Sequence, residues 1–291
     1  MNRPLLLLVG VGLMLGLNFP IGKLAMAAGV APAVWAAVIS LGAGAILAII
    51  IRITETPELR PSPKLQFSLI SGFVSYVMPN FLTFLVIPKI GSGLAAIMFA
   101  LSPVVTALLS LVLRVRPPKS LGLLGIGLGL IGALVIILGH NNNLEFARAS
   151  WVFVALLIPI FLGVGNVYRT KYWPQGASPL TLASLTNLAA VPFLIAIALL
   201  QTPFSFAPLA QIPELILLQL AVSTTMFLMF FRLQHIGGPT YLSQIGYVAA
   251  AVGIIIGVTY FHETYPLLVW VGAGIILIGI GFSTWEQVRS S

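Results

Sequence analysis

The sequence predicts an all-α membrane protein with ten transmembrane helices, arranged as two inverted five-helix repeats. An apolar composition, ten long apolar segments and a duplicated residue pattern lead to this fold class. Hydrophobic residues make up 59% of the 291 residues and charged residues only 7%, whereas a soluble domain carries about 25% charged residues. A soluble globular domain is therefore excluded.

Each apolar segment is long enough to cross a bilayer, for which a helix needs about 20 apolar residues. Charged, proline-bearing or polar clusters separate the segments. In hydrocarbon each segment is expected to be helical, because an unpaired backbone amide there costs several kcal/mol. The expected spans cover approximately residues 4–28, 31–53, 64–88, 91–113, 119–139, 151–172, 178–201, 212–235, 238–261 and 266–286.

The two halves of the chain share residues at a nearly constant offset. Asn18 and Lys23 of the first span recur 148 positions later as Asn166 and Lys171. Further matches, at offsets of 146 or 147, pair Gly29 with Gly176, Pro32 with Pro179, Ile90-Gly91 with Ile236-Gly237, and Gly132 with Gly279. This pattern predicts a first repeat at 1–145 and a second at 146–291. Because five spans is an odd number, the second repeat is expected to be inverted.

The basic residues provide an independent test of this topology. With a cytoplasmic N-terminus, only Lys23, Lys89 and Arg148 fall on the outer side. The cytoplasmic side holds Arg3, Arg52, Arg60, Lys64, Arg114, Arg116, Lys119, Arg169, Lys171, Arg232 and Arg289. This bias predicts that both termini are cytoplasmic. The net charge of +8 comes without a basic run interleaved with aromatics, so no nucleic-acid partner is expected.

The chemistry of an enzyme is not supported by the residue inventory. Cysteine and aspartate are absent, which excludes disulfides, thiolate nucleophiles and cysteine-ligated metals. His140, His235 and His262 all lie at span ends, and His262-Glu263 lacks the second histidine of a zinc motif. No phosphate-binding loop occurs. We therefore predict no catalytic residues, no metal, no cofactor and no enzymatic activity.

Polar residues near the middle of a span are costly unless they face a cavity or a neighbouring helix. Inverted repeats can place a site near the midplane, where either side of the membrane can reach it. Tyr76 and Asn80 of the third span are four residues apart, hence on one helical face, and form the preferred substrate surface. The other candidate substrate-binding residues are Asn18, Met98, Phe99, Ser102, Asn166, Thr224, Phe227, Gln244 and Tyr247.

Proline within a span frees a backbone carbonyl and kinks the helix. The expected gate hinges are Pro20, Gly22, Pro79 and Pro103. A structural interpretation stays open beside the functional one: Asn18 and Asn166 could instead bond across helix interfaces, and Met98 and Phe99 could be core.

Every glutamate lies near a span end, so no mid-membrane carboxylate is available as a proton relay. This predicts uncoupled facilitation or exchange of a neutral or zwitterionic substrate. Tyrosine and phenylalanine near the axis suit an aromatic or apolar substrate, through stacking and burial.

Several segments resemble a known family: Gly16-x-Asn18-Phe19-x-x-x-Lys23, Leu101-Ser102-Pro103-Val104, the glycine-rich fifth and tenth spans, and Tyr260-Phe261-His262-Glu263. They resemble the drug/metabolite transporter superfamily, specifically its EamA-type exporters and within them the aromatic amino acid exporter branch. The resemblance implies a basket-like fold and export of metabolites such as amino acids across a bacterial inner membrane. Two positions depart from the pattern, because Leu15 stands where a tryptophan is often found and Arg116 stands near an expected glutamate. Only Glu263 matches that glutamate, and we expect it to be structural or gating.

The leading hypothesis is therefore an alternating-access exporter of neutral or zwitterionic metabolites, with aromatic or hydrophobic amino acids as the first candidates. A multidrug exporter of amphipathic compounds is the alternative within transport, and a membrane scaffold or lipid-handling enzyme is the alternative outside it. The expected partners are a small-molecule substrate and the lipid bilayer, and the oligomeric state is left open, a monomer being compatible with the sequence.

Overall fold

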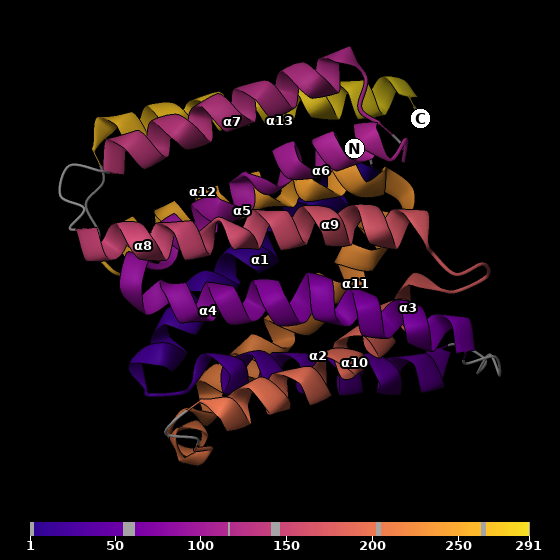
Figure 1. Cartoon of the computed structure of the whole chain (residues 1–291), viewed down its shortest axis with the longest axis vertical. Coiled ribbons are helices and arrows are strands. Elements are labelled where there is room, and N and C mark those ends of the chain that lie inside the picture. Colours follow the sequence, from indigo (N-terminus) through magenta and orange to yellow (C-terminus); the bar gives the residue numbers. More distant parts are fainter. Residues whose placement is uncertain are drawn as a thin grey trace.

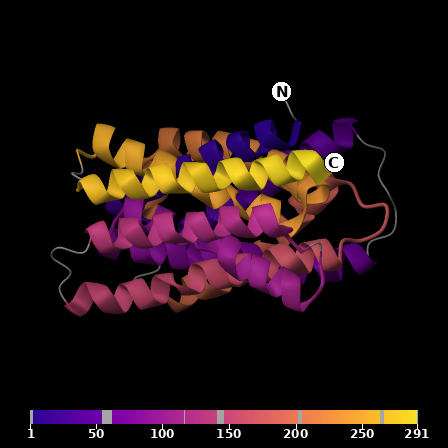
Figure 2. The ribbon, with the colours of Figure 1, turned by 90° about the horizontal axis from the view of Figure 1, so that it is seen from above.

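The fold comes from a computed structural model that describes residues 3–54, 62–115, 117–140, 146–201, 205–262 and 266–290. The regular structure in these ranges is entirely helical, as the composition predicted, and the all-α class is confirmed. The helices run side by side across the molecule, as the two views show (Figure 1, Figure 2).

The elements of the N-terminal half are α1 (Arg3–Ala27), α2 (Pro32–Thr54), α3 (Ser62–Gly72), the π-helix η1 (Phe73–Val77), α4 (Met78–Ile90), α5 (Ser92–Ala100), α6 (Ser102–Val112) and α7 (Ser120–His140). Those of the C-terminal half are α8 (Phe146–Ala155), α9 (Leu157–Lys171), α10 (Pro179–Leu200), the 3-10 helix η2 (Ala207–Gln211), α11 (Pro213–Ser243), α12 (Ile245–Thr259) and α13 (Leu267–Ser290).

Within the described residues, seven helical stretches are long and apolar enough to cross a membrane, which makes the chain a multi-pass membrane protein. These stretches cover residues 4–27, 32–54, 64–90, 95–112, 153–171, 179–200 and 213–243. The other three expected spans contain shorter apolar helices, at 120–132, 245–259 and 270–279. The expected count of ten passes therefore stays a prediction.

Several expected spans are interrupted helices, and proline explains two of the interruptions. Pro79 has no amide hydrogen for the carbonyl of Ser75, and the π-helix η1 lies directly before it. α5 ends at Ala100 and α6 begins at Ser102, with Pro103 in its first turn. By contrast, α1 continues from Arg3 to Ala27 with Pro20 inside it. Two of the predicted hinge residues, Pro79 and Pro103, thus lie at helix interruptions, whereas Pro20 does not.

Two helix pairs form opposite edges of the molecule: α2 packs on α10, and α7 packs on α13 (Figure 1). Glycine permits the close approach of α7 and α13, because a Cβ on Gly132 would fall 2.5 Å from the carbonyl oxygen of Gly272. The glycine-rich fifth and tenth segments therefore pack against each other within one chain. At the other edge, between α2 and α10, the Ser184 hydroxyl donates to the carbonyl of Gly44 over 2.8 Å.

The backbone turns at corresponding points of the two halves. In the described ranges, the glycines with positive φ are Gly29 (84°), Gly91 (85°), Gly176 (70°) and Gly238 (72°). Gly29 pairs with Gly176 and Gly91 with Gly238, each at an offset of 147 residues. Arg114 (53°) and His262 (54°) are the described non-glycine residues with positive φ, and they are 148 residues apart. Five of these six residues lie between two helices, and Gly238 lies at a kink inside α11.

Candidate functional site

A cavity of about 50 Å³ lies between α1, the η1–α4 segment, α5, α6, α9, α11 and α12. Aromatic side chains form much of its wall, from Tyr76, Phe99, Phe227 and Phe230. Polar groups reach the same wall from Ser75, Asn80, Ser102, Asn166 and Ser243. An apolar chamber with a few polar groups is the usual composition of a small-molecule site.

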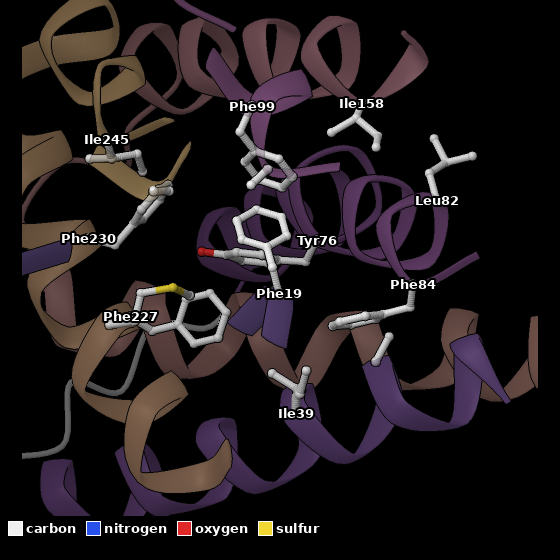
Figure 3. Close-up of a cluster of buried hydrophobic side chains, with 14 of the residues drawn as sticks. Phe19, Ile39, Tyr76, Leu82, Phe84, Phe99, Ile158, Phe227, Phe230 and Ile245 are labelled. Carbon is white, nitrogen blue, oxygen red and sulfur yellow. The ribbon is translucent and has the colours of Figure 1, made fainter. Parts of the chain in front are cut away.

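The aromatic wall is built by edge-on contacts between helices that are distant in sequence. The Tyr76 and Phe227 rings are 4.9 Å apart at 83°, and those of Phe19 and Phe99 are 5.1 Å apart at 81°. Figure 3 shows these rings gathered into one group, with the hydroxyl end of Tyr76 pointing toward the side of Phe230 and Ile245. Edge-to-face pairs are a favoured aromatic geometry, so the wall has a defined shape.

The structure brings together about half of the residues that the sequence suggested for substrate binding. The cavity wall includes Tyr76, Asn80, Phe99, Ser102, Asn166 and Phe227, together with the expected hinge residue Pro79. Buried beside the cavity, and not part of its wall, are Asn18, Met98, Thr224, Gln244 and Tyr247. Leu15, at the position where the resembling exporters often have tryptophan, also lines the cavity. Gly22 packs against the ring of Phe84 in α4.

Asn18 joins α1 to α11 through a compact set of hydrogen bonds. Its Oδ1 accepts from Gln219 Nε2 at 2.5 Å and from the Ser223 hydroxyl at 3.3 Å, while its Nδ2 donates to the Met14 carbonyl at 2.7 Å. All three polar side chains are buried. Of the two interpretations left open for Asn18, this geometry favours the bond across a helix interface.

We expect this interface to show measurable energetic coupling in a double-mutant cycle of Asn18→Ala and Gln219→Ala. Hydrogen bonds between membrane helices average about 0.6 kcal/mol and reach about 1.7 kcal/mol, so a coupling energy in that range is expected from thermal or denaturant unfolding in detergent. Pairing Asn18→Ala with Thr259→Ala, whose hydroxyl bonds only its own helix, should give purely additive effects. A coupling energy of zero for the Asn18 and Gln219 pair would contradict the interface role.

Asn166, the repeat counterpart of Asn18, takes part in a second network that includes a buried arginine. The Nη2 of Arg169 donates to Asn166 Oδ1 at 2.6 Å, and its Nε donates to Gln234 Oε1 at 3.2 Å. The guanidinium carbon lies 4.9 Å from the centre of the Phe230 ring. Asn166 also donates to the Thr106 hydroxyl at 3.3 Å, so it both joins helices and lines the cavity.

Arg169 is the main residue that the sequence interpretation missed. Its position near the end of a span placed it among the charges that set topology, but its side chain is only 1% exposed. Its spacing of three residues from Asn166 was the available signal, because that spacing puts both residues on one helical face. Gln219 and Gln234, buried polar residues of α11, were also missed.

Two residues named for the family resemblance, Arg116 and Glu263, lie outside the residues that the structure describes. Within the described ranges, no three histidine or glutamate side chains gather as metal ligands.

The model of the EamA-like transporter family matches this chain twice, at residues 2–138 and at 149–285. The chain belongs to this family. The expected resemblance to EamA-type transporters is thus confirmed, and the protein is a multi-pass membrane protein of a transporter family.

Two further similarities describe how this EamA-like protein relates to known proteins. Protein RarD of Streptomyces exfoliatus is 26% identical over 172 residues, which cover 57% of this chain and 50% of that protein. The matching part thus spans about half the length of this curated relative. A solved crystal structure aligns with a TM-score of 0.68 and 14% identity, covering 97% of each chain. At that identity the likeness concerns the fold alone.

Proposed function

We propose that this EamA-like protein is an alternating-access carrier that exports neutral or zwitterionic metabolites, with aromatic and hydrophobic amino acids as the leading substrates. The observation that carries the proposal is the central cavity, whose wall combines the rings of Tyr76, Phe99 and Phe227 with the polar residue Asn80. The rings suit an apolar side chain, and the amide and hydroxyl groups suit the polar end of a small metabolite.

The size of the cavity supports a carrier that changes conformation. Its volume of about 50 Å³ is well below the 300 to 1,000 Å³ of typical ligand sites. A substrate must therefore separate the helices that now surround the cavity. We propose that this narrow arrangement alternates with wider ones that open to one side of the membrane or the other.

An inverted repeat would supply the two open arrangements by symmetry. Two findings support the repeat: the family model matches residues 2–138 and 149–285, and the positive-φ residues recur at offsets of 147 or 148. We propose ten passes, divided into repeats at 1–145 and 146–291. The bias of basic residues supports both termini in the cytoplasm. The resemblance to EamA-type exporters favours a bacterial inner membrane.

We further propose that transport is gradient-independent, either facilitated diffusion or exchange. No glutamate lies near the middle of an expected span, where proton-coupled carriers commonly hold a carboxylate. An exporter of amphipathic drugs is the second candidate, since the aromatic wall would also suit such compounds. A scaffold or lipid-handling role is less favoured, because it provides no reason for the polar groups that line a cavity.

Counterflow in proteoliposomes tests the proposal directly. Vesicles preloaded with unlabelled amino acid should accumulate labelled phenylalanine, leucine or threonine without an ion gradient. Asn80→Ala should lower this accumulation about tenfold, the effect of losing one hydrogen bond worth about 1.4 kcal/mol.

The matched control is Asn187→Ala. Asn187 is a buried asparagine of α10 whose side chain donates to the Ala183 carbonyl of its own helix, away from the cavity. At equal amounts of folded, reconstituted protein, Asn187→Ala should retain counterflow. Absence of counterflow for all three amino acids would overturn the amino-acid assignment and favour drug-like substrates.

A further inference from the structure

Arg169 brings a positive charge into the helical bundle, with only 1% of its surface exposed. No carboxylate among the described residues forms an ion pair with it. Glu286 accepts from the backbone amides of Lys119 and Gly122, at the edge helix pair α7 and α13. Glu214 lies in the first turn of α11, about 30 Å along that helix from Gln234. A buried cation of this kind is costly unless a counter-charge is provided.

One end of the guanidinium has no partner. Nη2 and Nε are occupied by Asn166 and Gln234, whereas Nη1 is buried without a hydrogen bond. Among the other buried polar groups that lack a hydrogen bond are the hydroxyls of Ser75 and Tyr76. Unpartnered buried polar groups are uncommon in native structures and call for an explanation.

Arg169 Nη1 and the hydroxyl groups of Ser75 and Tyr76 lie around Gly165 and Phe230. A Cβ on Gly165 would fall 3.3 Å from Arg169 Nη1 and would overlap the Ser75 hydroxyl. The Phe230 ring lies 4.9 Å from the Arg169 guanidinium carbon and 6.5 Å from the Tyr76 ring. Gly165 therefore leaves room for Nη1 and Ser75, and Phe230 is flanked by Arg169 and Tyr76.

The cluster adjoins the central cavity. The wall of the cavity includes Ser75, Tyr76, Asn166 and Phe230. Arg169 donates a hydrogen bond to Asn166 and lies over the ring of Phe230. Figure 3 shows the Tyr76 hydroxyl pointing toward Phe230, away from the rings of Phe99 and Phe19. The polar groups of Ser75, Tyr76 and Asn166 thus share the cavity wall with the rings of Phe99, Phe227 and Phe230.

The free groups are donors of hydrogen bonds. A guanidinium N–H can only donate, and each hydroxyl can donate to an anion. We propose that Arg169 Nη1, with the hydroxyls of Ser75 and Tyr76, forms a subsite for the carboxylate of the transported substrate. The inference rests on the proposed function and narrows its substrate class to metabolites that carry a carboxylate next to an apolar or aromatic group.

The substrate carboxylate would supply the missing counter-charge. Pairs of guanidinium and carboxylate are among the strongest hydrogen-bonded contacts in proteins, and planar geometry permits two parallel bonds. Movement of α9 relative to η1 would let the carboxylate reach Nη1, while Nη2 and Nε keep the side chain in place. An uncharged amphipathic drug would leave the cation without a counter-charge.

If Arg169 only joined α9 to α11, a different result would be expected. Its replacement would lower the stability of the protein, but Arg169 would not discriminate between ligands with and without a carboxylate. The test therefore compares phenylalanine, leucine and threonine with their carboxamides, which keep the amine and the side chain.

Binding to purified protein is measured first, as the ligand-induced rise in the midpoint of thermal unfolding in detergent. At least one amino acid should raise the midpoint, and its amide should bind at least about tenfold more weakly. Arg169→Gln should remove this discrimination. Ser75→Ala and Tyr76→Phe, which delete single hydroxyl groups, should reduce it and keep the proposal testable if Arg169→Gln fails to fold. Arg232→Gln, an exposed arginine of α11, is the matched control and should leave discrimination unchanged.

Counterflow separates the two proposals. Equal binding of amino acids and amides, or no binding of any amino acid, would overturn the carboxylate subsite. Counterflow of amides as fast as amino acids would also overturn the subsite, while leaving the carrier proposal intact. Binding of amino acids that depends on Arg169, without counterflow, would support the subsite and overturn the transport of these substrates.

Discussion

Replacing Gly246 with valine is expected to destabilise this protein by about 3 kcal/mol, the upper part of the usual range for overpacking. Gly246 of α12 lies against the backbone of α5, where an added Cβ would fall 2.6 Å from the carbonyl carbon of Phe99 and 3.2 Å from the amide nitrogen of Ala100. A backbone cannot rotate away as a side chain can, so the two helices must move apart. Because Gly246 and Phe99 both line the cavity, transport should be lost as well.

Thermal unfolding in detergent measures this effect, with an expected fall in melting temperature of about 5 °C or more. Gly274→Val is the matched control, since a Cβ on this exposed glycine of α13 would have open space within 4 Å. The control should change the melting temperature little. Equal melting temperatures for the two variants would contradict the close packing of α5 on α12.

Gly238→Ala is expected to cost about 1 to 3 kcal/mol, for a reason that lies in the backbone. Gly238 has φ 72° and ψ −176° and lies inside the long helix α11, five residues before its end at Ser243. That region of φ and ψ is essentially restricted to glycine, because a Cβ clashes with the backbone there. Pro239 follows directly, so the kink cannot be relieved by continuing a regular helix.

Gly281→Ala is the control for this substitution. Gly281 lies in α13, and a Cβ there would meet nothing within 4 Å. Since alanine has the higher helix propensity, the control should be neutral or stabilising, whereas Gly238→Ala should lower the midpoint of unfolding. A stabilised Gly238→Ala variant would mean that α11 is straight at this point.

Much of the fold followed from the sequence, because hydrocarbon allows so few backbone conformations. Apolar segments such as residues 4–28 and 31–53 had to be helices in a bilayer, and α1 and α2 cover them almost completely. Breaks near Pro79 and near residues 236–238 were also expected from the sequence, but their form was not. The structure has a π-helix at Phe73–Val77 before Pro79, and α11 continues through a kink at Gly238 to Ser243.

The candidate site was likewise predicted only in part from the sequence. Tyr76 and Asn80 share a helical face through their spacing alone, and the structure places both on the cavity wall. Gln244 and Tyr247 have an equally suggestive spacing, but both are buried without lining the cavity. Tyr247, for example, packs against Gly129 of α7. Periodicity identifies a face of a helix and leaves open which neighbour covers that face.

The sequence by itself determined the environment of this protein and its helical class, because composition and segment length decide whether a chain can remain in a bilayer. Its motifs indicated the transporter family, which the family model matches in both halves. Only the tertiary structure decided the environment of Arg169. From the sequence it was one more charge near a span end. The crossing of α9 with α11 places Gln234 and Phe230 around it, covers it from lipid and water, and leaves one guanidinium nitrogen beside the cavity. Such an environment comes from residues more than sixty positions apart, which packing alone brings together.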